Sequence, residues 1–412
     1  MSVTTFPDDQ VSLKSRLRRA ERVQRLRALG LVLPLFLFIL ITFVTPIVIL
    51  MTRAVENPEI ADNFPKTIEA LHGWDATDLP GEPVFAAFAD DLRLAQKNKA
   101  TGLVGKRLNY EIPGTRSKML QAGRAAEKMT TGPYKEAFLK LDPLWGKAET
   151  WKVIERAGHR ATTFYLLKSI DLQWSPADEI VRVAADQRLF VDVFVRTLGI
   201  SMGVTLATLI FGFPIAYLLA TLPARHSNML MILVLLPFWT SLLVRTTAWV
   251  VVLQTEGPVN DLLLWLGITN EPLQLIFSRF GTIVAMTHIQ LPFTLLPIYS
   301  VMKTISPNYV RAARSLGAGP FSAFWKIYFP QTMPGIAAGC LLTFILCLGY
   351  YITPALVGGP TDQMISYFVA LYTNRELNWG QASALGAILL AATLVLYALY
   401  NKLVGIDKMK LG

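Results

Sequence analysis

The chain has 412 residues and a formal net charge of +10, and 53% of its residues are hydrophobic whereas only 17% are charged. A soluble domain of this length usually carries more charge. The apolar residues also fall in blocks about twenty residues long, which is the length that a helix needs to cross a bilayer. The composition therefore excludes an ordinary soluble protein and predicts a membrane protein.

The beginning of the chain is basic, because residues 1–30 contain seven Lys or Arg and an apolar block follows at once. This order is typical of a cytoplasmic flank and disfavours nucleic-acid binding. The apolar block over residues 31–52 has the position of a secretory signal, but it is longer than a signal core and no small-residue cleavage site follows it. We therefore expect a cytoplasmic N-terminus at 1–30 and an uncleaved transmembrane helix at 31–52.

A long stretch of mixed charge comes next. From Arg53 to Arg188 the sequence contains 20 Lys or Arg and 19 Asp or Glu, so this stretch is nearly neutral. Aromatic residues are scarce in disordered segments, whereas this stretch contains Trp74, Trp145, Trp151 and Trp174. We expect a mainly helical, folded insertion over 53–192. It shows no catalytic or metal-binding motif, and the chain's isolated histidines are expected at surface or packing positions rather than as ligands: His72, His159, His226 and His288.

Five further apolar blocks lie at about 197–222, 229–253, 281–302, 333–357 and 379–400. The distribution of basic residues orients them, because cytoplasmic loops are enriched in Lys and Arg. With the N-terminus in the cytoplasm, the inner segments contain fifteen Lys or Arg and the short outer loops contain two. The expected fold is all-α, with six transmembrane helices, both termini in the cytoplasm and a periplasmic insertion. Residues 193–403 would form the five-helix core and 404–412 a cytoplasmic tail.

The inner loop 303–332 is too long and too ordered for a plain connector. Ser306 can cap a helix that begins at Pro307, where the missing N–H costs nothing, and Gly317 is a natural left-handed stop. A second short helix is expected from Pro320, with one apolar stripe that consists of Phe321, Phe324, Trp325 and Tyr328. The charged residues of the loop are all basic, namely Lys303, Arg311, Arg314 and Lys326. Two interpretations follow: an amphipathic turn on the lipid headgroups, or a docking element for a cytoplasmic partner.

The spacing within this loop resembles the EAA loop of bacterial ABC-importer permeases. That loop reads Glu-Ala-Ala, three residues, Gly, nine residues, Ile, one residue and Leu-Pro. The matching positions here are Arg311, Ala312, Ala313, Gly317, Ile327 and Pro330. Arg311 replaces the usual Glu and Phe329 the usual Leu, whereas the spacing is intact. The resemblance implies a type I importer permease fold, in which the loop forms a coupling helix that lies in a groove of an ATPase subunit.

Other runs resemble the permeases of spermidine/putrescine-type importers. They are PFWTSLLVRTTAW (237–249), EGPVN (256–260), ITPALVGGP (352–360) and RAARSLGAGPFSAFWKIYFP (311–330). The resemblance covers about Phe190–Tyr400 and leaves out 53–188. It implies a multi-pass permease subunit of the bacterial inner membrane that forms the translocation path of an ATP-binding cassette importer by alternating access. The implied solute is a polyamine such as spermidine or putrescine, or alternatively another small solute such as an amino-acid derivative or opine.

The resemblance also implies partners. These are ABC ATPase subunits, a second permease subunit, a periplasmic solute-binding protein and membrane lipid, with no nucleic acid among them. A nucleotide site in this chain is not expected, because a Walker A loop needs G-x-x-x-x-G-K-[ST]. Arg107 follows Gly105 and Lys106 here, and Ala100 stands in place of the first glycine. We therefore expect a non-catalytic subunit without a cofactor, with ATP and Mg²⁺ bound by the partner ATPase.

Polar side chains inside apolar blocks are candidates for the transport path. Arg245 is the only charge inside a block, and its side chain would either snorkel to the surface or face the path. The other path candidates are Trp239, Thr240, Thr246, Trp249, Gln290, Tyr350 and Tyr351. The candidate acids at the outer mouth are Glu256 and Asp362. Two glycine pairs with GxxxG spacing, Gly199/Gly203 and Gly335/Gly339, predict close helix packing.

Two other classes of protein compete with the permease interpretation. A secondary transporter would usually show an internal repeat or charged residues at mid-membrane. A membrane-anchored sensor or enzyme would show a catalytic set in 53–192 or a signalling domain on the inner side. Neither pattern is visible in the sequence, so the permease interpretation is preferred.

Overall fold

The computed structural model describes residues 7–175 and 178–404, and the chain divides into two units, 1–53 and 54–412. In the first unit, helix α1 (Pro7–Ile39) continues through a π-helical turn (Leu40–Val44) into α2 (Thr45–Arg53). The stretch Ala20–Arg53 is long and apolar enough to cross a membrane, and its side chains are exposed. An apolar helix therefore covers the predicted 31–52 segment.

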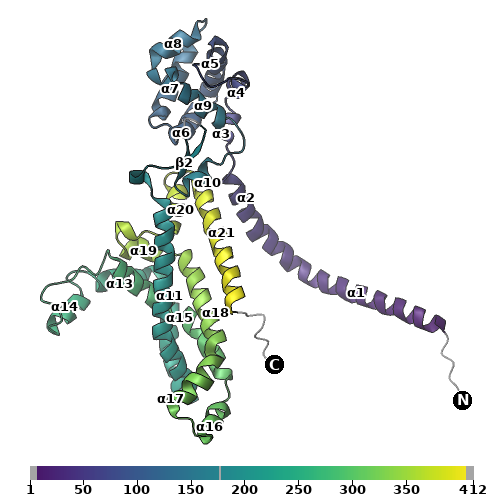
Figure 1. Cartoon of the computed structure of the whole chain (residues 1–412), viewed down its shortest axis with the longest axis vertical. Coiled ribbons are helices and arrows are strands. Elements are labelled where there is room, and N and C mark those ends of the chain that lie inside the picture. Colours follow the sequence, from purple (N-terminus) through teal and green to yellow (C-terminus); the bar gives the residue numbers. More distant parts are fainter. Residues whose placement is uncertain (1–6, 176–177, 405–412) are drawn as a thin grey trace. The chain divides into compact units, whose positions relative to one another are not determined.

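The second unit begins with a helical insertion, and its predicted mainly helical character is confirmed (Figure 1). A short antiparallel hairpin of β1 (Leu172–Trp174) and β2 (Ile180–Arg182) follows the helices and pairs Leu172 with Arg182. A 3-10 turn (Ala185–Gln187) leads into the membrane bundle. The helices of the insertion are α3 (Pro58–Ala61), α4 (Pro65–Leu71), α5 (Glu82–Lys97), α6 (Thr101–Asn109), α7 (Thr115–Lys128), α8 (Tyr134–Leu141), a 3-10 turn (Pro143–Gly146), α9 (Ala148–Ala157) and α10 (Phe164–Lys168).

Aromatic side chains fill the core of the insertion. On α5, the buried apolar residues recur at helical spacing and form one face: Val84, Phe85, Phe88, Ala89, Leu92 and Ala95. The ring of Trp151 lies 4.6 Å from Phe85 and 5.2 Å from Phe88, centroid to centroid, and the Phe88 ring lies 5.0 Å from Trp145. The indole N–H of Trp151 donates to the carbonyl oxygen of Trp145 at 3.0 Å. Two of the four tryptophans noted in the sequence thus form the centre of this core.

The insertion is attached to the bundle by polar contacts. The carboxylate of Asp171 accepts hydrogen bonds from the backbone N–H groups of Leu189, Phe190 and Val191 at 2.8–3.1 Å. These N–H groups open α11 (Phe190–Thr221) and lack partners within that helix. The helix α10 packs against α21 (Trp379–Val404), and Gln381 donates to the Ser169 hydroxyl at 2.8 Å.

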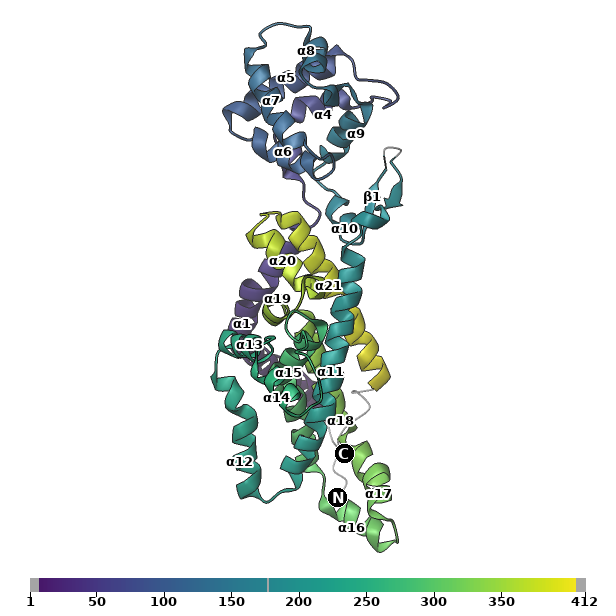
Figure 2. The ribbon, with the colours of Figure 1, turned by 90° about the vertical axis from the view of Figure 1, so that its left-hand side faces the viewer.

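The membrane bundle is built around α11, α15 (Arg279–Thr304) and α18 (Phe329–Leu348), which pack on one another (Figure 2). In the part of the chain that the structure describes, five helices are long and apolar enough to span a membrane. The count is six if the bent pair α12 (Ala224–Leu235) and α13 (Leu242–Val252) forms one span. The remaining elements are a 3-10 turn (Leu236–Trp239), α14 (Pro258–Trp265), α16 (Pro307–Ser315), α17 (Pro320–Ala323), a π-helical turn (Phe324–Tyr328), α19 (Ile352–Val357), a 3-10 turn (Pro360–Asp362) and α20 (Ile365–Asn374).

Two of the predicted apolar blocks are not single helices. The block 229–253 breaks between α12 and α13, whose axes differ by 97°. Pro237 lies in the 3-10 turn at the break, where it lacks an N–H for a helical bond, and the Ser241 hydroxyl caps the new helix by accepting from the Val244 N–H. The block 333–357 ends at Leu348, and the chain restarts as α19.

The glycine pairs behave differently from each other. A Cβ atom on Gly339 would lie 2.5 Å from the carbonyl oxygen of Thr294, and one on Gly335 would lie 3.0 Å from the Cα atom of Ile298. This pair allows α18 to approach α15, so the predicted close packing is confirmed. A Cβ on Gly203 would lie 3.5 Å from Cδ1 of Ile283 on α15, whereas one on Gly199 would meet nothing within 4 Å among the described residues. Close packing is therefore not found at Gly199, because the spacing of glycines does not specify which face of a helix is covered.

Candidate functional site

The loop 303–332 contains the helix that the sequence predicts. Ser306 is the N-cap of α16, and its hydroxyl accepts a hydrogen bond from the Asn308 N–H at 3.4 Å, while Pro307 occupies the first turn. The helix ends at Ser315, and Gly317 follows with a φ of +91°. The left-handed stop is therefore confirmed. The Ala318 N–H donates to the Ala313 carbonyl at 3.0 Å, which closes the helix end.

The expected second short helix is not separate. It begins at Pro320, but α17 continues through the π-helical turn 324–328 into α18, and Pro320–Leu348 passes as one apolar span. The expected apolar stripe also divides. Phe324 and Tyr328 pack into the bundle against α11, whereas the side chains of Phe321 and Trp325 are exposed. The periodicity alone did not show which of the four aromatic residues the bundle covers.

The loop therefore has an inner and an outer surface. Val310 packs with Phe324 and Tyr328 on a core cluster that includes Leu219 of α11 and Leu295 of α15. The outer surface combines apolar and basic side chains, which are Tyr309, Leu316, Phe321, Trp325, Arg311, Arg314 and Lys326. Among the residues of the family-like spacing, Arg311, Ala312, Gly317 and Pro330 are exposed, and Ala313 and Ile327 are half-buried. Such a surface is suited to contact a protein groove with acidic edges.

Several path candidates meet where α13, α15 and α19 adjoin. The Thr246 hydroxyl is buried and lies 3.1 Å from the Thr353 hydroxyl, which joins α13 to α19. The indole N–H of Trp249 donates to Nδ1 of His288 at 3.1 Å, which joins α13 to α15. Since an indole nitrogen can only donate, this contact leaves the proton of a neutral imidazole on Nε2.

Arg245 is half-buried beside this group. Its guanidinium carbon lies 6.0 Å from the centroid of the Phe238 ring, and its Nε atom is buried without a hydrogen-bond acceptor among the residues that the structure describes. His288 and Tyr350 lie close enough to interact with its charge. A buried N–H without an acceptor costs about 1–3 kcal/mol, so this atom is a place where water or a solute can bind.

The other path candidates are placed differently. Trp239 is 75% exposed, Tyr351 is 41% exposed, and the Thr240 hydroxyl donates to the Pro237 carbonyl at 2.8 Å. Gln290 is fully buried on α15, and its Oε1 atom has no partner among the described residues. Contacts with Thr353, His288 and one another thus group Arg245, Thr246, Trp249 and Tyr350.

The two candidate mouth acids also differ. Glu256 is exposed. Asp362 is buried, accepts from Nε of Arg279 at 3.0 Å, and accepts from the Gly359 N–H at 3.3 Å. Its charge is therefore matched inside the chain, so Glu256 is the acid of the pair that faces outward.

Sequence reasoning missed a chain of hydroxyl groups inside the bundle. The Thr294 hydroxyl on α15 donates to Thr208 on α11 at 2.8 Å and lies 2.6 Å from the Thr343 hydroxyl on α18. Thr208 in turn donates to the Thr205 carbonyl at 2.9 Å. His288 and Thr353 were missed as well. The available signal was a threonine or histidine inside a block free of charge, but the blocks contain many threonines and the sequence does not show which of them meet across helices.

Comparison with known proteins identifies the class of this bundle. Residues 197–405, half of the chain, match the family described as binding-protein-dependent transport system inner membrane component. The chain belongs to this family. The insertion lies outside the matched residues. The family consists of transmembrane permease subunits of ABC importers, which are multi-pass inner-membrane proteins and generally not catalytic.

Two relatives in sequence agree with this assignment. The chain is 35% identical over 191 residues to the spermidine/putrescine transport system permease protein PotB of Escherichia coli, covering 46% of this chain and 70% of that protein. It is 32% identical over 228 residues to the inner membrane ABC transporter permease protein YdcU of Escherichia coli, covering 51% and 69%. A crystal structure of a bacterial alginate ABC transporter in complex with an alginate pentasaccharide-bound periplasmic protein matches with a TM-score of 0.43 and 21% identity, over 53% of this chain and 79% of that one.

Proposed function

We propose that this permease subunit forms the translocation path for a polyamine-type solute, and that α16 couples the path to a separate ATPase. The observation that carries the coupling role is the two-sided loop 303–332. Its inner residues Val310, Phe324 and Tyr328 pack on α11 and α15, while its outer surface is apolar, basic and exposed. A displacement of α16 by a partner is therefore transmitted to the two central helices of the bundle.

The charge distribution and the placement of the elements support one orientation in the membrane. The helices α16 and α17 lie at one end of the second unit and the insertion at the other (Figures 1 and 2). With the basic segments inside, loop 303–332 and both termini face the cytoplasm, and residues 53–192 face the periplasm. In this arrangement the ATPase subunits, which bind ATP and Mg²⁺, contact α16. The insertion is on the side where a periplasmic solute-binding protein delivers the solute, and a second permease subunit completes the path.

The polyamine assignment is supported by the similarity to PotB. The aromatic side chains Trp249, Tyr350 and Tyr351 can attract an ammonium group through their ring faces. The charge of Arg245 repels a cation, however. The spans 197–222, 281–302 and 379–400 contain no carboxylate.

Arg245 supports a second candidate solute. An amino-acid derivative or opine carries a carboxylate, which can accept a hydrogen bond from the buried Nε atom of Arg245. The two assignments are separated by measuring uptake in cells that depend on this importer, while unlabelled putrescine, spermidine and an opine compete with one another. Inhibition by the opine alone would exclude the polyamine assignment.

The coupling role is tested by two matched glycine variants. Gly317 and Gly319 are both exposed, and a Cβ on either meets nothing within 4 Å. They differ in backbone conformation, because φ is +91° at Gly317 and −66° at Gly319. A side chain in the left-handed region costs about 1–2 kcal/mol. Gly317→Val is therefore expected to redirect α16, abolish uptake and weaken co-purification of the ATPase.

The matched control Gly319→Val introduces the same side chain where the backbone accepts it, so uptake and ATPase recovery should stay near wild-type. Both are measured at equal levels of inserted permease. Wild-type uptake by Gly317→Val would show that loop 303–332 is not the coupling element, whatever the identity of the solute.

A further inference from the structure

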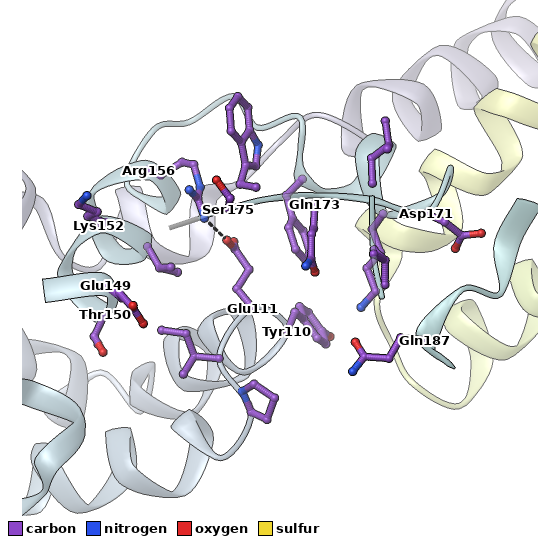
Figure 3. Close-up of a pocket in the computed structure, with 18 of the residues that line it drawn as sticks. Tyr110, Glu111, Glu149, Thr150, Lys152, Arg156, Asp171, Gln173, Ser175 and Gln187 are labelled. Atoms are coloured by element: carbon purple, nitrogen blue, oxygen red, sulfur yellow. Dashed lines mark hydrogen bonds and ion pairs between the residues drawn. The ribbon is translucent and has the colours of Figure 1, made fainter. Parts of the chain in front are cut away.

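The insertion contains a pocket of about 550 Å³, which we call the basal pocket (Figure 3). It lies among the end of α6, the helix α9, the helix α10 and the hairpin, and its principal lining residues are Tyr110, Glu111, Arg156, Phe164, Lys168 and Trp174. A volume of this size is typical of sites for small molecules. The pocket is outside the transport path, so its role is independent of the proposed function.

The acid at the centre of the basal pocket is already neutralised. One carboxylate oxygen of Glu111 accepts from Arg107 at 2.8 Å, and the other accepts from Arg156 at 2.8 Å. Figure 3 shows the second of these ion pairs. Arg156 also contacts Asp178 on the exposed turn of the hairpin at 2.9 Å. The negative charge of Glu111 is therefore already compensated by two guanidinium groups, which disfavours a cationic ligand at this carboxylate.

The second acid that lines the pocket is also occupied. The carboxylate of Asp171 accepts three backbone N–H groups at the start of α11. Glu149 is exposed at the rim, where Lys147 and Lys152 also lie. A polyamine would thus find no unoccupied buried carboxylate here, so the basal pocket is not a second site for a cationic solute.

The charged group of Lys168, unlike that of Glu111, has no ion-pair partner among the described residues. Its side chain is half-buried, and its ammonium nitrogen lies 5.7 Å from the ring centroids of both Tyr110 and Phe164. Among the described residues it has no carboxylate partner. Burial lowers the pKa of Lys168, and the nearby guanidinium of Arg107 lowers it further, while the carboxylate of Glu111 opposes this shift only in part.

Lys168 is therefore a half-buried cation at this pocket that has no carboxylate paired with it among the described residues. Arg107 and Arg156 pair with Glu111, Arg156 also pairs with Asp178, and the buried Asp171 is held by backbone N–H groups, so none of these acids is within ion-pair distance of Lys168. The guanidinium of Arg107 lies 4.5 Å from the centroid of the same Phe164 ring that Lys168 contacts. Desolvated cations are costly unless an anion accompanies them, and the open volume beside Lys168 is where such an anion can enter.

We propose that the basal pocket binds a small organic anion, whose carboxylate or phosphate pairs with Lys168 and whose apolar part lies against the aromatic side chains of Tyr110 and Trp174. The amides of Gln173 and Gln187 also line the pocket and can donate to further oxygen atoms of the ligand. A soluble metabolite and a lipid headgroup both offer this chemistry. The site gives the insertion a ligand of its own, with a charge opposite to that of a polyamine.

The test uses the full chain in nanodiscs of zwitterionic lipid. Citrate and glycerol 3-phosphate are titrated by calorimetry, and at least one is expected to bind. Lys168→Met should weaken that binding about tenfold or more, because a charge-assisted pair is lost, and Lys168→Arg should retain most of it. Lys97→Met removes an exposed lysine of α5 outside the pocket and should change nothing.

A second pocket variant controls for the possibility that Lys168→Met weakens binding through a folding defect. Trp174→Ala truncates a side chain of the hairpin and should weaken binding without altering the protease pattern of the helical part. Nanodiscs with phosphatidylglycerol distinguish a soluble metabolite from a lipid headgroup as the ligand. A headgroup that occupies the pocket would weaken the binding of citrate and glycerol 3-phosphate to the wild-type protein but not to Lys168→Met. Failure of both probes and of phosphatidylglycerol to bind, or binding that is equal in wild-type and Lys168→Met, would overturn the proposal.

Discussion

The insertion and the membrane bundle of this chain bury different kinds of side chain. The insertion has a core of large rings and branched residues, such as Phe88, Trp145 and Trp151, and several of its charges form ion pairs. The bundle buries small and hydroxylated residues, including Gly339 and Thr294, and exposes apolar side chains. Examples of the exposed apolar set are Ile210, Phe211, Leu394 and Val395.

The difference reflects the solvent that each region meets. In water, removing apolar area from solvent drives folding, and large rings contribute most. Between helices in lipid that drive is absent, so association depends on close backbone approach and on hydrogen bonds between helices. The same chain therefore has two cores with different sensitivities to substitution, and three substitutions measure this difference.

The largest effect is expected for Trp151→Ala in the insertion. Trp151 is fully buried, contacts the Phe85 and Phe88 rings, and donates to the Trp145 carbonyl. Truncation of a buried tryptophan costs about 3–5 kcal/mol. We expect the insertion to become sensitive to protease while the bundle remains inserted and resistant.

Trp265→Ala is the control for this prediction, because Trp265 is 81% exposed on α14. It should leave the protease pattern of the insertion unchanged. If Trp151→Ala instead destabilised the bundle as strongly as the insertion, the two cores would form one cooperative unit and the comparison would fail.

The sequence predicted the contents of these regions better than their geometry. Blocks of apolar residues located the spans, since length and composition suffice for that. They could not show that α12 and α13 meet at 97°, because the break depends on Pro237 and on the Ser241 cap within a run that stays apolar. Tryptophan content similarly indicated a folded insertion, but not that Trp145 and Trp151 share one core.

The candidate site shows the same limit. The cap at Ser306 and the stop at Gly317 are local features, and the sequence predicted both. The grouping of Arg245 with His288 and Thr353 depends on contacts between helices distant in sequence. The pairing of Asp362 with Arg279 is likewise non-local, so the sequence did not show that this candidate acid of the outer mouth is buried.

An intermediate effect is expected for Gly339→Ala. The added Cβ would lie 2.5 Å from the Thr294 carbonyl oxygen, so α18 must move away from α15. Overpacking of this kind costs about 1–3 kcal/mol. We expect a lower melting temperature in detergent and lower membrane levels, with the insertion still resistant to protease.

Gly199→Ala adds the same methyl group to α11 where nothing lies within 4 Å. It should be neutral or slightly stabilising, because alanine favours the helix over glycine. Equal losses in both variants would mean that glycine content, rather than the contact of α18 with α15, determines the stability of the bundle.

The smallest effect is expected for Thr294→Val, which removes the central hydroxyl of the chain that joins α18, α15 and α11. The Thr294 hydroxyl donates its one proton to the Thr208 hydroxyl, so the Thr343 hydroxyl must donate to Thr294. Valine has nearly the same shape, so the change tests the hydrogen bonds rather than the packing. Hydrogen bonds between membrane helices contribute about 0.6 kcal/mol on average, and we expect a loss of roughly this size in reversible unfolding.

The control is Thr304→Val, because the exposed Thr304 hydroxyl bonds only to the Val301 carbonyl of its own helix. A double variant sharpens the test. Thr294→Val leaves the buried Thr343 hydroxyl without its acceptor, whereas replacing both partners by apolar groups of the same shape removes that penalty. Thr294→Val with Thr343→Val should therefore be no less stable than Thr294→Val alone. If the losses of stability from Thr294→Val and from Thr343→Val simply added in the double variant, the two hydroxyls would act independently. Hydrogen bonding between α15 and α18 would then not distinguish the bundle from the insertion.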